Sequence, residues 1–183
     1  RMLGCRLDTV PIRPAMNAFD DMLAPLFEGR DRDITEENIQ SRIRGLALMG
    51  ISNKFGPMLL TTGNKSEMSV GYATIYGDMA GGYNPLKDAY KTTVFAISRW
   101  RNAARPKIGL GPDGMVMPER IITKPPSAEL RPDQKDQDSL PAYEVLDAII
   151  ARYMENDEGV EALIADGFER ADVEKVTRLI KLN

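Results

Sequence analysis

The most constraining feature of this 183-residue chain is a short apolar run that leads through a polar turn into a helical pattern. Residues 57–62 (Pro-Met-Leu-Leu-Thr-Thr) form the run, residues 63–67 (Gly-Asn-Lys-Ser-Glu) form the turn, and residues 66–76 carry the helical pattern. Strand, turn and helix in this order are typical of layered α/β folds, and ligands of open α/β sheets bind at the carboxyl ends of strands. The turn is therefore the first place to expect a binding site.

Helical periodicity dominates the rest of the chain. Thr35 is predicted to cap the second helix, because two glutamates follow in its first turn. Only residues 7–12 and 57–62 have the pattern of strands, which is few for a complete doubly wound sheet. Residues 103–141 are rich in Pro and Gly, and so long an irregular stretch is usually a functional loop or a linker. The predicted helices cover residues 14–27, 36–50, 92–101, 160–165 and 172–182, and another begins at Pro141.

The composition limits the available chemistry. The chain has no histidine and a single cysteine, Cys5, which excludes Ser-His and Cys-His nucleophile pairs, imidazole metal ligation and an intrachain disulfide. Carboxylates, cations and bound metal remain, and they suit phosphoryl or nucleotidyl transfer. A net charge of -3 predicts no general attraction to nucleic acid or to anionic membranes. Because the chain shows no apolar membrane span and no signal-peptide pattern, we expect a cytoplasmic protein.

The polar turn has two interpretations on spacing alone. In the first, Thr62 and Lys65 serve phosphate or ribose groups, and Glu67 supplies a hard oxygen ligand for Mg2+. In the second, the turn is an ordinary polar loop in which Ser66 caps a helix and the charges are solvated. The turn is not a Walker A motif, because the Gly-x4-Gly-Lys pattern is missing.

Longer sequence blocks go beyond spacing. Together they resemble the synthetase domain of NAD+ synthetases, in family order between about residues 36 and 147, and the longer matches indicate the glutamine-dependent form. The blocks are residues 36–42 (Glu-Glu-Asn-Ile-Gln-Ser-Arg), 52–56 (Ser-Asn-Lys-Phe-Gly), 60–67 (Leu-Thr-Thr-Gly-Asn-Lys-Ser-Glu), 76–79 (Tyr-Gly-Asp-Met) and 124–134 (Lys-Pro-Pro-Ser-Ala-Glu-Leu-Arg-Pro-Asp-Gln).

The resemblance implies an α/β fold of the ATP-pyrophosphatase type (adenine nucleotide alpha hydrolase-like), with a parallel sheet and flanking helices. It also implies a ligase that forms a carbon–nitrogen bond, with ATP and Mg2+ as cofactors. The nicotinate carboxylate of deamido-NAD attacks the α-phosphorus of ATP, pyrophosphate leaves, and ammonia from a glutaminase domain converts the adenylate to NAD+ and AMP. No protein nucleophile is needed, so no catalytic side chain is assigned. Family members form homodimers, so a homodimer or higher homo-oligomer is expected.

The family's binding residues carry over at six positions of this chain. The ATP contacts implied by the resemblance are Thr62, Lys91 and Ser127. The deamido-NAD contacts are Asn38, Arg42 and Glu67, and the first two lie four residues apart on one predicted helix face. Glu67 matches an acidic residue that binds either Mg2+ or deamido-NAD in different family forms, and both roles stay open. Without the resemblance, Thr62 is a helix-entry hydroxyl, Lys91 a solvated lysine at a helix start and Ser127 a turn serine. Asn38 and Arg42 then belong to an ordinary exposed helix face.

The chain departs from the family in what it lacks. The Ser-Gly-Gly-x-Asp-Ser pyrophosphate loop, the basic C-terminal segment and the glutaminase domain are not among the 183 residues. We therefore expect residues 1–183 to be part of an NAD+ synthetase domain and to be inactive alone. Two alternatives remain: the domain of another amidotransferase of the ATP-pyrophosphatase type, or a non-catalytic oligomerisation module.

Overall fold

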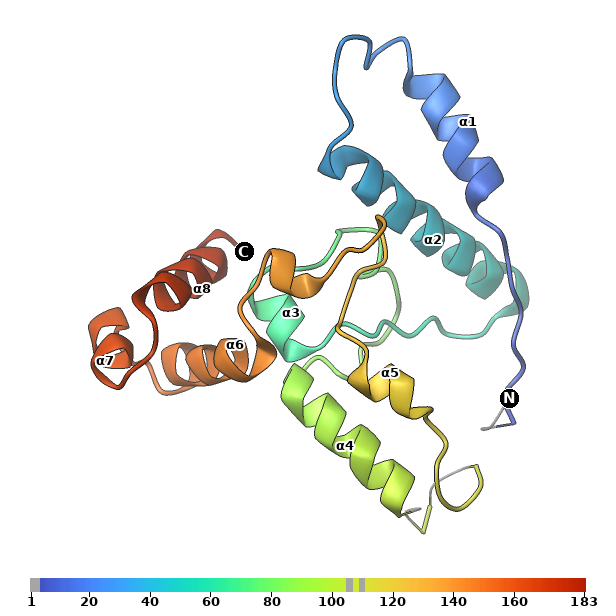
Figure 1. The fold of residues 1–183 in the computed structure, drawn as a ribbon. Coiled ribbons are helices and arrows are strands. Elements are labelled where there is room, and N and C mark those ends of the chain that lie inside the picture. The colour runs from blue at the N-terminus through green and yellow to red at the C-terminus, as the bar shows by residue number, and fades with distance from the viewer. Residues whose placement is uncertain (1–3, 105–106, 109–110) are drawn as a thin grey trace.

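A computed structural model describes residues 4–104, 107–108 and 111–183, and helices dominate these residues (Figure 1). No regular strand occurs in the described ranges; Leu60 and Tyr83 form an isolated parallel bridge. The α-helices are α1 (Arg13–Leu23), α2 (Ile34–Phe55), α3 (Lys65–Ser69), α4 (Lys91–Ala103), α5 (Glu119–Thr123), α6 (Tyr143–Ile150), α7 (Val160–Ala165) and α8 (Arg170–Leu182). A 3-10 turn, η1 (Asp136–Asp138), precedes α6, and a π-helical turn, η2 (Ala151–Glu155), follows it.

The hydrophobic core lies at the C-terminal end of the chain, where α6, α7 and α8 pack together (Figure 1). Leu146 and Ile149 of α6, Leu163 of α7 and Val173 of α8 have no exposed surface. Val70, directly after α3, joins the same cluster. The core therefore anchors α3, and with it the turn that the sequence marked as a binding site.

Helix α2 begins at a capping box that differs from the predicted cap. Asp33 is the N-cap: its Oδ1 accepts from Thr35 N at 2.7 Å, and Glu36 Oε2 accepts from Asp33 N at 2.8 Å. These hydrogen bonds with Thr35 lower the pKa of Asp33. The prediction that Thr35 caps the helix was wrong by two residues, because an acidic side chain with a glutamate three positions later satisfies two free amides at once. The helix ends at Gly56, whose φ of 86° is left-handed.

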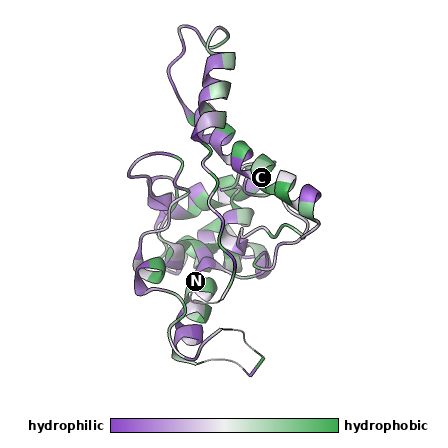
Figure 2. Cartoon of the chain, turned by 90° about the vertical axis from the view of Figure 1, so that its right-hand side faces the viewer, coloured by the Kyte–Doolittle hydropathy of each residue, from purple (hydrophilic) through white to green (hydrophobic). Residues whose placement is uncertain are grey.

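The apolar segments expected to be strands are not regular strands here. Residues 7–12 have no regular backbone structure before α1, and Leu7 and Val10 are 74% and 57% exposed. Residues 57–62 make the single bridge to Tyr83. An isolated pair of strands is marginal in water, so neither segment can form a sheet without further strands beside it. Apolar and polar residues are mixed along the helices (Figure 2). Many large apolar residues are exposed, including Leu26 and Phe55.

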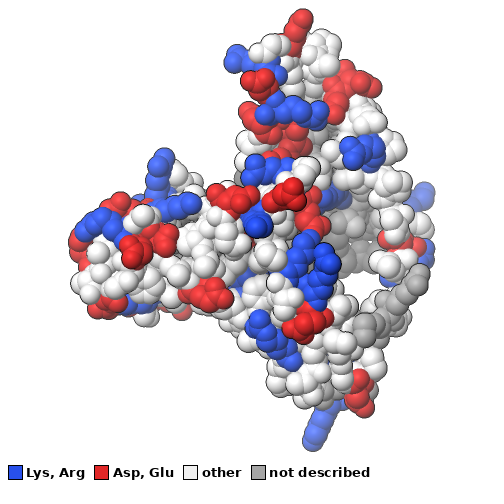
Figure 3. Space-filling model, in the orientation of Figure 1, with Lys and Arg blue, Asp and Glu red and all other residues white. Residues whose placement is uncertain are grey.

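The predicted irregular stretch at 103–141 is mostly irregular, although residues 105–106 and 109–110 lie outside the description. The short helix α5 and the turn η1 interrupt it. Asn102 ties the stretch back to α4: its Oδ1 accepts from Val116 N at 2.9 Å and Met117 N at 3.0 Å. Acidic and basic side chains are interspersed on the face shown in Figure 3. Within the described residues, no helix combines the length and apolar character needed to cross a bilayer.

Candidate active site at the α3 turn and the α2 pocket

The turn before α3 is fixed by backbone hydrogen bonds and by a capping box. Thr61 N donates to Tyr83 O at 3.0 Å, and the bridge is parallel, so the segments after residues 61 and 83 leave at the same end. Asn64 caps α3: its Oδ1 accepts from Glu67 N at 3.0 Å, and Glu67 Oε2 accepts from Asn64 N at 3.3 Å. Asn64, and not Ser66, is therefore the helix cap.

Two of the predicted site residues, Lys91 and Glu67, form an ion pair. Lys91 Nζ lies 2.8 Å from Glu67 Oε1, and the two side chains are 19% and 18% exposed. The ammonium also lies 5.3 Å from the ring centroid of Tyr143, close enough for a cation–π contact. Residues separated by 24 positions thus meet at the mouth of the turn. Thr62, two residues before the cap, is exposed at the same turn.

Glu67 alone is a poor metal site. One of its oxygens faces the Lys91 ammonium and the other accepts a backbone amide. Among the described residues, no group of three or more cysteine, aspartate or glutamate side chains is placed to hold a metal ion. A divalent cation needs several oxygen ligands, and a neighbouring ammonium repels it. The residues described here do not fit a magnesium site by themselves.

A buried hydrogen-bond network lies directly behind the Lys91–Glu67 pair. Ser66 Oγ donates to Asp147 Oδ1 of α6 and accepts from Lys91 N at 2.9 Å. Asp147 Oδ2 accepts from Thr92 N at 2.9 Å and from Thr92 Oγ1 at 2.7 Å. Sequence reasoning missed Asp147. The available signal was an acidic residue directly between apolar positions of the helix that begins near Pro141.

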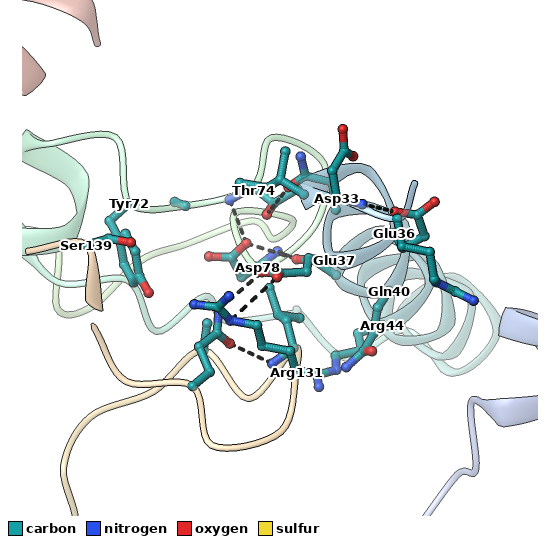
Figure 4. A pocket seen from close by; sticks show the side chains of 18 of the residues that line it. Asp33, Glu36, Glu37, Gln40, Arg44, Tyr72, Thr74, Asp78, Arg131 and Ser139 are labelled. Carbon is teal, nitrogen blue, oxygen red and sulfur yellow. Dashed lines mark hydrogen bonds and ion pairs between the residues drawn. The ribbon is translucent and has the colours of Figure 1, made fainter. Parts of the chain in front are cut away.

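An open pocket of about 730 Å³ lies between α2 and two loops, residues 71–78 and 128–139 (Figure 4). Charged groups of both signs line it, and Figure 4 shows Arg131 facing Glu37 of α2. Its polar and charged lining residues are Arg32, Asp33, Glu36, Glu37, Asn38, Gln40, Ser41, Arg44, Tyr72, Thr74, Asp78, Arg131, Gln134 and Ser139.

The predicted pair Asn38 and Arg42 contacts one loop, but only Asn38 lines the pocket. Asn38 lines the pocket, and its Oδ1 accepts from Thr74 Oγ1 at 3.0 Å. Arg42 is exposed, and its Nε donates to Ile75 O at 3.2 Å. Close backbone packing makes this contact possible, because a Cβ built on Gly77 would overlap the side chain of Ser41. The loop can lie on α2 only where glycine leaves room.

Ser127 lies at the start of the second loop and is engaged in a local turn, its Oγ accepting from Glu129 N at 3.0 Å. The loop is held against α2 by several contacts. Arg44 Nη2 donates to Glu129 O at 3.0 Å, and Gln134 Nε2 donates to Glu37 Oε2 at 3.1 Å. Ser127 directly precedes Ala128, a pocket-lining residue, but no hydrogen bond joins it to Thr62 or Lys91 in the described structure.

A pair of tyrosines connects the pocket with the ion pair. Tyr143 OH, whose ring faces Lys91, donates to the buried Asp136 Oδ2 at 2.6 Å. Burial, and then the Asp136 carboxylate, raise the pKa of Tyr143. The same two causes raise the pKa of Tyr72, a pocket residue, to about 12. Tyr143 is thus the tyrosine of the pair whose hydroxyl donates to Asp136. Among the described residues, Asp136 Oδ1 is buried without a hydrogen-bond partner.

A smaller hollow of about 200 Å³ lies at the α3 turn, lined by Thr61, Gly63 and Asn84. Ala73 and Asp78 line both this hollow and the larger pocket. Ser41 Oγ fixes the shared wall by donating to Asp78 Oδ1 at 3.0 Å. The hollow beside the predicted ATP turn and the pocket that Asn38 lines thus share a wall, although Thr62 and Lys91 line neither of them.

Comparisons with known proteins agree on one family. The profile of the NAD synthase family matches residues 1–183. A glutamine-dependent NAD(+) synthetase from Rhodobacter capsulatus is 59% identical over 183 residues, which are 100% of this chain and 33% of the relative. Another from Xanthomonas campestris pv. campestris is 54% identical and covers 100% of this chain and 32% of the relative.

Solved structures give the same result. The glutamine-dependent NAD+ synthetase from Acinetobacter baumannii in complex with ADP is 48% identical, with a TM-score of 0.56, covering 92% of this chain and 28% of that one. An NMN synthetase from Francisella tularensis, at 23% identity, shares the fold with a TM-score of 0.71 over 95% of this chain and 60% of that one. The chain spans about a third of the length of the curated relatives. Its full-length match to the family profile shows that the chain belongs to the NAD synthase family.

Proposed function

We propose that the natural protein carrying this chain is a glutamine-dependent NAD+ synthetase. It activates the carboxylate of deamido-NAD with ATP, releasing pyrophosphate, and ammonia then displaces AMP to give NAD+. The observation that carries this proposal is the wall shared by the two hollows, formed by Ala73 and Asp78. Attack of a carboxylate on the α-phosphorus requires the two substrates to meet in one geometry, and adjacent sites supply that proximity.

The proposed residue roles rest on the family match, because only Asn38 among the six predicted residues lines either hollow. Thr62 and Lys91, at the α3 turn, bind ATP, and Ser127 joins them from the second loop. Asn38 and Arg42 bind deamido-NAD from α2. Glu67 is paired with Lys91 at 2.8 Å. Its two oxygens are engaged by cationic and amide donors, so we assign it to holding Lys91 rather than to a metal ion, and the family match adds a role toward deamido-NAD.

We include magnesium in the proposal because Mg2+ is usually bound together with the phosphates of ATP. Bound together with ATP, the ion would neutralise charge on the leaving pyrophosphate. Because the described residues do not form a metal site by themselves, no step is assigned to it.

The architecture is proposed with the function. Residues 1–183 form part of a synthetase domain with a parallel sheet and flanking helices, and the parallel direction of the Leu60–Tyr83 bridge supports this. A glutaminase domain supplies ammonia, and the enzyme is cytoplasmic. We also propose a homodimer or larger homo-oligomer. Leu48, Ile51 and Phe55 of α2, which are 48%, 40% and 77% exposed, share one helix face and are apolar surface that a second subunit can cover. A fully active monomer in light scattering would contradict the oligomer.

The decisive experiment measures NAD+ and AMP formation by the natural protein with deamido-NAD, ATP, and either glutamine or ammonia. We expect equal amounts of both products from either nitrogen source. Thr62→Val should raise the apparent KM for ATP about 10-fold or more, because it removes a hydrogen bond to a charged ligand. Thr123→Val is the matched control, since the exposed Thr123 hydroxyl donates to Glu119 O of its own helix.

Two outcomes would overturn the proposal. Product formation with another carboxylate acceptor, and none with deamido-NAD, would indicate a different amidotransferase of the same fold. If neither AMP nor a nucleotide-dependent thermal shift is observed, the chain belongs to a non-catalytic module.

A further inference from the structure

The first turn of α4 is held by two buried side chains from other helices. Ser66 of α3, which has no exposed surface, accepts from Lys91 N at 2.9 Å. Asp147 of α6, 6% exposed, accepts from Thr92 N at 2.9 Å and Thr92 Oγ1 at 2.7 Å. Ser66 also donates to Asp147, which joins the two acceptors in one network. Tyr90, the N-cap residue itself, makes no side-chain cap hydrogen bond.

This arrangement fixes where the Lys91 ammonium lies. The Lys91 amide is held by α3 and the next amide by α6, so the backbone at the base of the lysine side chain is held by two hydrogen bonds. The side chain then extends to Glu67 at 2.8 Å, beside the ring of Tyr143. Because side-chain acceptors already occupy these first two amides, they are not available to an anionic ligand. The positive charge offered at this place is that of the lysine.

The free-energy cost of burying the Asp147 carboxylate indicates that this residue does more than stabilise the fold. Its carboxylate is buried and forms no ion pair in the described part of the chain, where hydroxyl and amide groups surround it. A buried charge without a counter-charge is expensive, and well-packed apolar residues usually give equal or greater stability. The partial positive charge at the start of α4 stabilises the carboxylate and offsets part of that cost. A side chain selected for stability alone would not need the charge.

We propose that Asp147 and Ser66 are positioning residues, which hold the start of α4 so that the Lys91 ammonium is presented at the nucleotide turn. This inference rests on the ATP role proposed above for Lys91. Neither Asp147 nor Ser66 contacts the nucleotide in this proposal; they act through the backbone of residues 91 and 92.

A double-mutant cycle in the natural protein tests the proposal. Ser66→Ala and Asp147→Asn should each raise the apparent KM for ATP about 10-fold, the size of one hydrogen bond next to a charged group. In a Lys91→Met background, the same substitutions should change that KM less than about 2-fold, because the group that they position is gone. Thr177→Val is the control: Thr177 is equally buried, but its hydroxyl bonds within α8. It should lower the melting temperature without changing the KM for ATP.

A second readout does not depend on activity. Acetylation of lysines, followed by peptide mass spectrometry, measures how well Lys91 is held against Glu67. We expect Ser66→Ala and Asp147→Asn to speed acetylation of Lys91, while the exposed Lys54 at the end of α2 reacts at its wild-type rate. Thr177→Val should leave the Lys91 rate unchanged.

The outcomes separate this inference from the proposed function. An increase in KM that persists in the Lys91→Met background overturns the positioning role. If Lys91→Met has no effect on ATP, the ATP role of Lys91 is wrong, and the acetylation rate alone decides the inference. A faster rate in both variants then supports positioning of Lys91, and a wild-type rate overturns it.

Discussion

Glu67→Gln should loosen α3 and the start of α4 locally. The substitution keeps an acceptor for Asn64 N but removes the charge that faces Lys91 Nζ at 2.8 Å. Both side chains are less than a fifth exposed, so solvent screens the pair only partly. A hydrogen bond between charged groups at such a place contributes about 1.5–3 kcal/mol. If the substitution lowers the free energy of local opening by about 2 kcal/mol, amide hydrogens in this region should exchange roughly 30-fold faster.

Hydrogen–deuterium exchange of peptides that cover residues 64–70 and 91–95 measures this effect without global unfolding. Asp88→Asn is the matched control, because Lys87 Nζ also lies 2.8 Å from Asp88 Oδ2, but these side chains are 59% and 84% exposed. Exposed pairs contribute little, so exchange in the control should stay close to wild type. Lys91→Met should reproduce Glu67→Gln, and the double variant should not exceed either by much. Equal, small effects of Glu67→Gln and Asp88→Asn would refute the reasoning.

Three further predictions concern the pocket. Gly77→Ala should destabilise the protein by about 1–3 kcal/mol, seen as a lower melting temperature, because the added methyl group would overlap Ser41; an unchanged temperature would disprove the close contact. Asn38→Ala should raise the apparent KM for deamido-NAD about 5-fold and leave the KM for ATP unchanged. A raised KM for ATP alone would instead assign Asn38 to ATP binding. Tyr72 has a pKa of about 12 in the folded protein against 10.0 ordinarily, so its phenol loses the proton first in the unfolded chain, and stability should fall as the pH rises from 10 to 12. Chemical denaturation across that range should show a shallower fall for Tyr72→Phe, and parallel curves would contradict the assignment.

Local signals predicted the helices well, because periodicity and capping act over a few residues. Residues 160–165 form α7 with the predicted bounds. The helix expected over residues 66–76 ends at Ser69 instead, because the chain turns at Gly71 with a φ of 67°. That turn brings Thr74 to Asn38 on α2, a contact over 36 positions that no local pattern contains.

The pairings within the candidate site could not be predicted from the sequence. The family resemblance pointed to Glu67 and Lys91 separately, whereas their ion pair depends on how α3 and α4 pack. Asp147 belongs to no block and lies on a helix whose pattern indicated only core, so sequence reasoning passed over it. The sheet could not be judged from residues 7–12 and 57–62 alone, because strand stability depends on the neighbouring strands.

The π-helical turn η2 makes this region sensitive to chain length as well as to side chains. Asn156 N donates to Ala151 O at 3.2 Å across five residues, a wider turn than an α-helix forms. Glu155, at its end, accepts from Lys65, the first residue of α3, and from the OH of Tyr90, the N-cap residue of α4. A π-helical turn holds one residue more than an α-helical turn, so converting this segment to an α-helix at constant length would rotate the side chains after it by about 100°. Relatives with a regular α-helix here should therefore be one residue shorter within this turn.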